Sequence, residues 1–544
     1  MRTHRLLAVL ACFNFPLIYA IPLGQPVTDC EGECSQFNRS PSNNAKFLSI
    51  RDDNGQCSPK DKTYSDEDMP DGIYEADSSP GSQYITIVNL TPYRCPQGRA
   101  RQNLAEYSED VGDTPVDTNG EAYYKIEGTD KKFSVKATTK IPDKHPRRAV
   151  IDLTGMGLGR REYKFPDKRL PVTLVITGSE EYGFTTSLKH GPGNWMRRMY
   201  SVIGDRDIQH IVLPGTHDSA MSTISGKITS IGTKENTQTQ GINIYSQLKA
   251  GARWFDLRIG TVHPVPDDGS WEFWSMHVND ELAEIAVGNT GESLDQVILE
   301  INNFTNENPG EVIFFRVRYL VGLRQVPSLG PVYWGEKIWH DFINKLKKVN
   351  NRCPDMDTKV QFQKQKASYF MDRNGGNGCV VFLLDEKNLK EAPSKHSVKD
   401  GIYSATMVDF WDNWSEKEDI REMANDQIAD WQGVDRKSNK DNRLLNGQWL
   451  VSADIVETTF EGIENLSVNG ANPVLYWKGV NNMSPEKWPN ILMVDYIGVV
   501  VPGETEWEQL SAELYTLVVG LNLYMISENC RDISKRRSPL LPKV

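Results

Sequence analysis

The clearest indication of the fold is the segment Ile208-Gln-His-Ile-Val-Leu-Pro-Gly-Thr-His-Asp-Ser219. It begins as an apolar run with the length of a buried strand and ends as a polar loop that carries His217. Similar runs recur along the chain, and amphipathic helical stretches stand between several of them. The expected strands are Ile208–Leu213, Arg253–Ile259, Glu272–Val278, Glu311–Arg318, Cys379–Asp385, Ser404–Asp409, Trp449–Val456 and Ile491–Gly498, and the expected helices include Leu294–Asn303, Gly335–Val349, Glu416–Trp431 and Glu506–Leu521. This alternation predicts an α/β fold, a (β/α)8 barrel of the TIM type.

The rest of the chain differs in composition from the barrel, which is expected at residues 195–530. Residues 1–20 carry Arg2 and Arg5 ahead of an apolar run, which is typical of a signal peptide. Residues 21–80 form a polar leader of low complexity, and residues 531–544 form a basic tail. Residues 81–190 hold short β-rich runs separated by Gly, Pro and Asp. These runs predict a small, sandwich-like domain that precedes the barrel.

The charge balance narrows the possible partners. A formal net charge of −12 over 544 residues disfavours nucleic acid, because phosphate backbones are bound by clustered Lys and Arg. No run approaches the roughly 20 apolar residues of a membrane-spanning helix. Any membrane contact is therefore expected to be peripheral and local.

Sequons and cysteines support a secreted, extracellular protein. Six Asn-x-Ser/Thr sequons are potential glycan acceptors: Asn38, Asn89, Asn303, Asn413, Asn465 and Asn482. Removal of the signal removes Cys12 and leaves seven of the eight cysteines, which suits disulfides formed in an oxidising compartment.

Polar residues gather near the carboxyl ends of the expected strands, the face at which barrel enzymes place their chemistry. In strand order these residues are His217, Asp256 with Arg258, His277, Arg318, Asp385, Asp409 and Asp495. Cleavage of a phosphodiester without a metal needs a base, an acid and a fixed cation, because negative charge develops while an alkoxide leaves. His217, His277 and Arg258 can supply this set.

Several of these segments resemble the successive signatures of the phosphatidylinositol-specific phospholipase C (PI-PLC) X-domain family. They are Leu213–Ser219, Gly251–Arg258, His277, Asn308–Arg318 and Met493–Ile497. The likeness extends from about Arg197 to Leu523 and leaves the first 190 residues outside. Arg258 stands where calcium-dependent members need oxygen ligands, so the sequence is most similar to the metal-independent branch and implies no metal and no cofactor.

The resemblance also implies a role for each residue. His217 would take the proton of the inositol 2-hydroxyl, and His277 would protonate the leaving glycerol oxygen, giving diacylglycerol and a cyclic inositol phosphate. Arg258, beside Asp256, would neutralise the charge at phosphorus. Asp495 would orient His217, and Asp218 would support His277. The implied substrate contacts are Arg318, Asp409 and the stacking aromatic Trp411, and the implied partner is an inositol phospholipid or a glycosylphosphatidylinositol at a membrane surface.

Some features depart from that branch and leave alternatives open. His277 is followed by Val278 instead of Gly, and Asp385-Glu386 stands where a basic residue would be expected. Trp271 and Trp274 can either insert into lipid or pack within their strand. The alternative functions are a metal-dependent glycerophosphodiester or sphingomyelinase-D-like phosphodiesterase, and a catalytically silent cell-surface binding protein.

Overall fold

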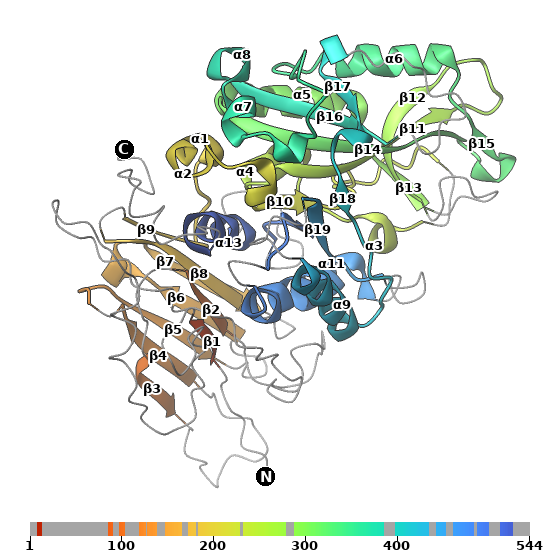
Figure 1. Cartoon of the computed structure of the whole chain (residues 1–544). Helices are drawn as coiled ribbons and strands as arrows, with labels where there is room; N and C mark the ends of the chain where they lie inside the picture. The colour runs from red at the N-terminus through yellow and green to blue at the C-terminus, as the bar shows by residue number, and fades with distance from the viewer. Residues whose placement is uncertain are drawn as a thin grey trace, which may run out of the picture. The chain divides into compact units, whose positions relative to one another are not determined.

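The computed structural model of the chain divides into two compact units (Figure 1). The larger unit comprises His190–Asn472 and Lys487–Tyr515, and the smaller comprises Met1–Lys189, Pro473–Glu486 and Thr516–Val544. The structure describes residues 8–12, 85–90, 97–103, 119–126, 128–138, 147–165, 172–180, 183–228, 232–278, 288–385, 398–434, 442–452, 461–483, 487–499 and 512–525. The expected leader (21–80), the basic tail (531–544) and most of the signal peptide lie outside these ranges.

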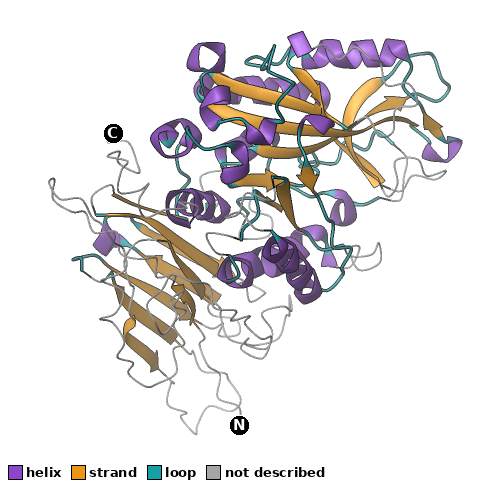
Figure 2. Cartoon of the chain, in the orientation of Figure 1, coloured by secondary structure: helices purple, strands orange, loops and turns teal. Residues whose placement is uncertain are grey.

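Eight parallel strands form the main sheet of the larger unit (Figure 2). They are β10 (Leu213–Thr216), β11 (Trp254–His263), β14 (Glu311–Arg324), β16 (Gly378–Leu384), β17 (Ile402–Ser404), β18 (Phe410–Trp411), β19 (Leu444–Trp449) and β20 (Ile491–Val494). Their spatial order is β17-β16-β14-β11-β10-β20-β19-β18, which is their chain order read around a circle. The sheet is curled, and the mixed α/β fold is confirmed. In the described ranges no pairing joins β17 to β18, so a closed (β/α)8 barrel stays a prediction.

Helices connect these strands where the apolar period of the sequence changes. The expected helix Leu294–Asn303 is confirmed as α5 (Leu294–Glu307), which buries Leu294, Val297, Ile298, Ile301 and Phe304 along one face. Ser293 caps it by accepting the N–H of Gln296. The other expected helices correspond to α6 (Glu336–Leu346), α9 (Ile420–Gly433) and α13 (Glu513–Gly520). A disulfide joins Cys353, which follows α6, to Cys379 on β16.

The expected third parallel strand is wrong in its direction. Glu272–Val278 does form a strand, β12, but it pairs antiparallel with β11 and with β13 (Gly288–Ser293). The connection from His263 to Glu272 explains this, because a parallel crossover needs a dozen or more residues and only residues 264–271 are available. β12 is therefore the return strand of a hairpin.

Three other expected strands are displaced along the chain. Ile208–His210 is a 3-10 turn, and β10 begins only at Leu213. Ala405–Met407 is also a 3-10 turn, which places β18 after Asp409, and β19 ends at Trp449 where the expected strand begins. These shifts decide which side chains reach the carboxyl edge of the sheet.

The smaller unit contains two sheets. One is an antiparallel meander of β3 (Gln97–Asn103), β4 (Asn119–Lys125), β5 (Lys132–Thr138), β6 (Arg147–Asp152) and β7 (Arg160–Phe165). The other has the order β1-β2-β8-β9, with β1 (Ala8–Cys12), β2 (Ile85–Leu90), β8 (Val172–Ser179) and β9 (Gly183–Thr186). Segments from the C-terminal half also belong to this unit. The sandwich-like domain at 81–190 stays a prediction in its boundaries and its packing.

Candidate active site

A network of six ionisable side chains lies at the carboxyl edge of the main sheet. The register pairs Thr216 of β10 with Phe255 of β11 and with Val494 of β20. The next residue of each strand therefore emerges at one level of the sheet. The members of the network are His217, Asp218, Asp256, Arg258, His277 and Asp495.

His217 is held at both ring nitrogens. Its Nδ1 lies 2.9 Å from Oδ1 of Asp495, and its Nε2 lies 2.7 Å from Nη2 of Arg258. Because a guanidinium only donates, Nε2 accepts, and Nδ1 carries the proton that Asp495 accepts. Gln240 joins the two strand ends by donating from Nε2 to the carbonyl oxygens of His217 and Val494. The network thus selects the neutral tautomer whose Nε2 lone pair faces Arg258.

His277 reaches the network from the return strand β12. Its Nδ1 lies 2.7 Å from Oδ2 of Asp218. The ring centroids of His277 and His217 are 6.2 Å apart, with their planes at 83°. The His277 side chain is 24% exposed and the His217 side chain 12%. Two imidazoles therefore lie side by side, each held by its own carboxylate.

Asp218 turns the chain sharply between the two histidines. Its φ of 41° lies in the left-handed region, which short polar residues such as Asp adopt more readily than others. Thr239 donates from Oγ1 to the Asp218 carbonyl oxygen, and the Asp218 side chain is fully buried. His217 can therefore contribute its own imidazole, while the next residue, Asp218, holds the imidazole of His277.

Arg258 is the central cation of the site. Its Nε lies 3.1 Å from Oδ2 of Asp256, and its Nη1 lies 3.4 Å from Oδ2 of Asp218. Nη1 also donates to the Tyr319 hydroxyl at 3.3 Å. Burial alone lowers the pKa of Arg258, but Tyr319, Asp218 and Asp256 outweigh it and raise that pKa well above its ordinary value. The positive charge is permanent.

Asp256 links two arginines. Its Oδ1 lies 3.5 Å from Nη1 of Arg318, on the opposite side from Arg258. Burial raises the pKa of Asp256, but the positive charges of Arg258 and Arg318 outweigh burial and hold this pKa below its ordinary value. Asp256 therefore stays ionised and positions both guanidinium groups.

A second polar cluster, missed by sequence reasoning, is centred on Arg316. Its Nη2 lies 3.2 Å from Oδ2 of Asp385, and its Nη1 binds Asp412. Oδ1 of Asp412 also accepts from Nδ2 of Asn446 at 2.9 Å and from Nε2 of Gln448 at 2.7 Å. The signal for Arg316 was the strand period, because it lies two residues before Arg318 and so on the same face of β14.

The structure does not bring Asp409 or Trp411 into the network. Asp409 is exposed and precedes β18, and its backbone N–H donates to Oε1 of Gln363. Gly433 at the end of α9 and the guanidinium of Arg443 face the Trp411 ring. Asp412, three residues further on, contacts Arg316, because β18 begins at Phe410, after the expected strand Ser404–Asp409.

Trp271 and Trp274 pack against protein side chains. Trp274 lies against a buried cluster that includes Val262 and Met276, donates from Nε1 to Glu272, and has the Lys227 ammonium over its ring. The Trp271 ring faces His263, and the Lys337 ammonium lies over it. These contacts favour packing over lipid insertion for both tryptophans.

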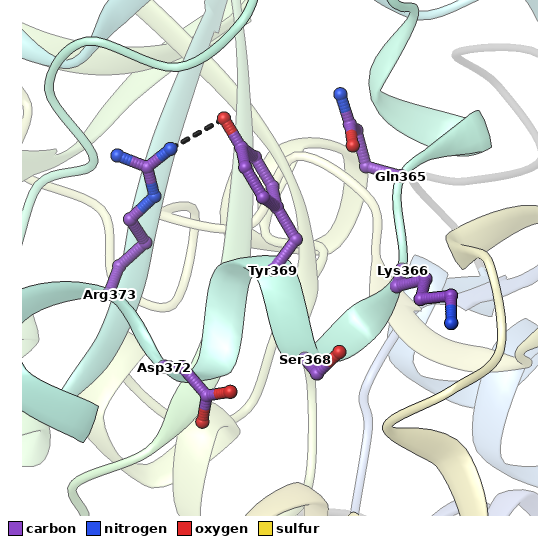
Figure 3. Close-up of a pocket in the computed structure, with 6 residues that line it drawn as sticks. All are labelled: Gln365, Lys366, Ser368, Tyr369, Asp372 and Arg373. Carbon is purple, nitrogen blue, oxygen red and sulfur yellow. Dashed lines mark hydrogen bonds between the residues drawn. The ribbon is translucent and has the colours of Figure 1, made fainter.

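A separate cavity of about 440 Å³, lined by no residue of the network, lies beside α7 (Ala367–Met371) and α8 (Arg373–Gly376) (Figure 3). Arg373 donates to the Tyr369 hydroxyl at its wall, and Asp372 accepts from Tyr200 and Arg197. α8 immediately precedes β16, so this hollow lies toward the amino end of that strand. The charged side chains that line this cavity are already paired with protein groups, so they are less available to a ligand than those of the network.

Two of the three carboxylates of the network are bound by arginine, and the third, Asp495, contacts His217. Asp256 and Asp218 both contact Arg258, so an added cation would have to displace a guanidinium. Within the described ranges, no group of three or more His, Cys, Asp or Glu side chains is arranged to hold a metal ion. In the same ranges, no helix has both the length and the apolar character needed to cross a bilayer.

Several curated proteins with similar sequences are named for a PI-PLC X domain or X-box domain. PI-PLC X domain-containing protein 3 of Homo sapiens is 28% identical over 183 residues, which is 30% of this chain and 50% of that protein. A PI-PLC X-box domain-containing protein of Dictyostelium discoideum is 28% identical over 137 residues, 23% of this chain and 16% of the relative. The matches support the PI-PLC X-domain family. This confirms the family resemblance in the sequence, although the matched stretches span half or less of each relative.

No family model matches the chain. Among solved structures, this chain is similar to the phosphatidylinositol-specific phospholipases C of Staphylococcus aureus and Listeria monocytogenes. The first is 15% identical, with 61% of this chain and 98% of that chain covered at a TM-score of 0.36. The second is 16% identical, with 60% and 98% covered at a TM-score of 0.35.

Proposed function

We propose that this chain is a metal-independent phosphodiesterase that cleaves phosphatidylinositol-type lipids to diacylglycerol and a cyclic inositol phosphate. The observation that carries the proposal is the pair of imidazoles 6.2 Å apart, each bound to a separate carboxylate. A displacement at phosphorus has an attacking oxygen and a leaving oxygen on opposite sides. Two separately held imidazoles suit these two oxygens.

His217 is the general base in this proposal. With Nδ1–H held by Asp495, its Nε2 can take the proton of the inositol 2-hydroxyl as that oxygen attacks phosphorus. Nε2 accepts from Arg258 in the free protein. Substrate binding therefore has to exchange this contact, and the freed guanidinium N–H can then donate to a phosphoryl oxygen.

His277 is the general acid. Its protonated imidazole gives a proton to the departing glycerol oxygen, while Asp218 holds Nδ1 and stabilises the cation. The base must be neutral and the acid protonated at the same time. We therefore expect a bell-shaped dependence of kcat/KM on pH.

The Arg316 cluster would form the head-group site. Arg316 is bound on both sides by Asp385 and Asp412, and the amides of Asn446 and Gln448 contact Asp412 as well. A compensated arginine beside carboxylates and amides offers partners for hydroxyl groups and little net attraction for additional phosphates. Unphosphorylated inositol is therefore the preferred head group in this proposal.

Turnover of purified protein on phosphatidylinositol vesicles tests the function, with and without chelator. His217→Ala should abolish product, while Asp409→Asn is the matched control because that carboxyl lies outside the network. Product that disappears with chelator would favour a metal-dependent phosphodiesterase. A wild type that forms no product would favour a silent binding protein.

Secretion is part of the same proposal and has a separate test. Asn303 and Asn413 are exposed, whereas Asn89 is fully buried. Expression in a eukaryotic secretory pathway should deliver the protein to the medium with glycans at the two exposed sites and none at Asn89, read by mass spectrometry. Cleavage after residue 20 would also remove β1. Retention in the cytosol without glycans would overturn secretion and leave the enzymatic proposal standing.

A further inference from the structure

β11 and β14 continue well beyond the catalytic residues. Their register pairs Arg258 with Arg318 and, further on, His263 with Arg324. Five residues of strand span roughly 16 Å, at about 3.3 Å per residue. β15 (Pro331–Val332) folds back onto β14 at this far end (Figure 1). The loops that cap the strands, residues 264–271 and 325–333, are called the apolar tip below.

The apolar tip concentrates exposed hydrophobic side chains. Within the described ranges, eight large hydrophobic residues are exposed, and four of them belong to this tip. They are Val265, Val326, Leu329 and Tyr333, with exposed fractions of 40%, 37%, 54% and 39%. Scattered exposed hydrophobics are ordinary on a protein surface, whereas half of them in two adjoining loops mark a contact surface.

Hydrogen bonds hold the two loops of the tip together. The Val265 N–H donates to Oε1 of Gln325 at 3.4 Å, and the Gln325 N–H donates to the His263 carbonyl oxygen at 2.8 Å. Arg324 donates from Nη1 to the carbonyl oxygens of Leu329 and Gly330. The two loops that carry the exposed side chains are therefore ordered by hydrogen bonds.

A buried residue, Trp334, anchors the apolar tip to the rest of the protein. Trp334, directly after the tip, is buried and donates from Nε1 to Oγ1 of Thr261 at 3.1 Å. Its ring packs against Phe273 and Phe342 at centroid distances of 5.5 and 5.0 Å. Exposure of the four hydrophobic residues is thus a feature of an anchored structure.

Charge indicates what kind of surface the tip fits. The tip itself carries two acidic residues, Asp267 and Asp268. Of the neighbouring basic residues, Arg324 donates to backbone carbonyl oxygens and Lys337 lies over the Trp271 ring. The whole chain has a net charge of −12. Without a basic cluster here, attraction to an anionic bilayer is absent. Apolar contact with a zwitterionic lipid surface remains.

We infer that the apolar tip inserts Val326 and Leu329 into the interface of a zwitterionic phospholipid bilayer. The tip lies on the carboxyl side of β11 and β14, the side on which Arg258 and Arg318 stand. A bilayer at this edge would therefore lie beside the network, which is where a lipid substrate must enter. The inference rests on the proposed function for its lipid substrate and adds the surface that docks the enzyme.

Binding to vesicles of pure phosphatidylcholine tests the inference without any turnover. We compare the wild type with Val326→Ser/Leu329→Ser and with Leu299→Ser, which changes a leucine of similar exposure (52%) on α5. The tip variant should lower the partition coefficient about tenfold, as expected for aliphatic side chains removed from the interface. Leu299→Ser should match the wild type, and added salt should leave binding unchanged.

The inference is overturned by a wild type that does not bind these vesicles, by equal loss of binding in both variants, or by loss of binding in high salt. A dimer that dissociates in the tip variant, seen by light scattering, would assign the tip to a second copy instead and also overturn it. Turnover of a water-soluble inositol phosphodiester, measured in parallel, should be equal in all three proteins. Its absence in the wild type would reject the proposed function, while vesicle binding still decides the tip.

Discussion

Nη2 of Arg258 donates to Nε2 of His217 across 2.7 Å, so the cation of the site occupies the lone pair of the residue proposed as the base. Arg258→Lys should lower kcat/KM by about 10²–10³-fold, because an ammonium cannot contact His217, Asp256 and Asp218 together. Turnover of a soluble inositol phosphodiester measures the effect. Arg373→Lys, outside the network, is the control. A loss of less than threefold would contradict the role given to Arg258.

The two carboxylates that hold the histidines should have separable effects. Asp495→Asn offers an amide donor to Nδ1 of His217 and so disfavours the tautomer that leaves Nε2 free, with an expected loss of about 10²–10⁴-fold in kcat. Asp218→Asn acts on the acid, His277. A substrate with an aryl leaving group needs little protonation and should therefore recover most of its rate in Asp218→Asn alone. Equal recovery in both variants would refute the assignment.

Head-group selection should respond to Asp412. Asp412→Asn removes one of the two carboxylates that compensate Arg316 and leaves its positive charge less balanced. Activity on a head group that carries extra phosphates should then rise several-fold relative to unphosphorylated inositol. Competition between the two soluble substrates gives this ratio. Asp409→Asn should leave it unchanged, and an unchanged ratio in Asp412→Asn would count against the head-group site.

Stability should depend on the protonation of Glu292. Burial raises the pKa of this carboxyl well above its ordinary value, and the neighbouring Glu300 raises it further, while Ser222 donates to Oε1 at 2.6 Å. A raised folded pKa means that stability is present at low pH and is lost as pH rises from about 4.3, the unfolded value, through the folded pKa. Glu292→Gln should therefore be more stable than the wild type at pH 8 and should show a flatter pH dependence in urea unfolding. Glu336→Gln, at an exposed position of α6, should reproduce the wild-type curve.

The Cys353–Cys379 disulfide should contribute to stability. It closes a loop of 26 residues, and both cysteines are buried. The double variant Cys353→Ser/Cys379→Ser should lose about 3 kcal/mol of unfolding free energy, the value expected for a loop of this length. Reductant should destabilise the wild type by a similar amount and leave the variant unchanged. A wild type insensitive to reductant would show that the two cysteines act only through packing.

Local patterns predicted the parts of the site that follow parallel strands. His217 and Asp495 are next to apolar runs, Leu213–Thr216 and Ile491–Val494, whose pairing brings them together, and Asp256 and Arg258 alternate along a strand. The direction of Glu272–Val278 could not be seen, because a strand reads the same in parallel and antiparallel sheets. Only the short connection from His263 carried that information.

Errors of a few residues in strand bounds had larger effects on the residues of the proposed head-group site. Placing the sixth strand at Ser404–Asp409 selected Asp409, whereas β18 begins at Phe410 and presents Asp412. The shift is caused by the turn at Ala405–Met407, where the Ser404 side chain accepts the Thr406 N–H, and composition alone does not reveal it. Arg316 was within reach of the sequence, since alternation with Arg318 places both on one face.

Because His277 lies on the return strand β12, its position does not depend on the length of the hairpin that carries it. His277 lies two residues beyond Ser275, which pairs with Ile259, so its level is set by pairing near the base of the hairpin. If two residues are added to each strand near the tip, or two are removed from each, that pairing is kept and every side chain stays on its face. The reach of the protein toward its surroundings can thus change in evolution or by design while the distance between the two imidazoles stays fixed.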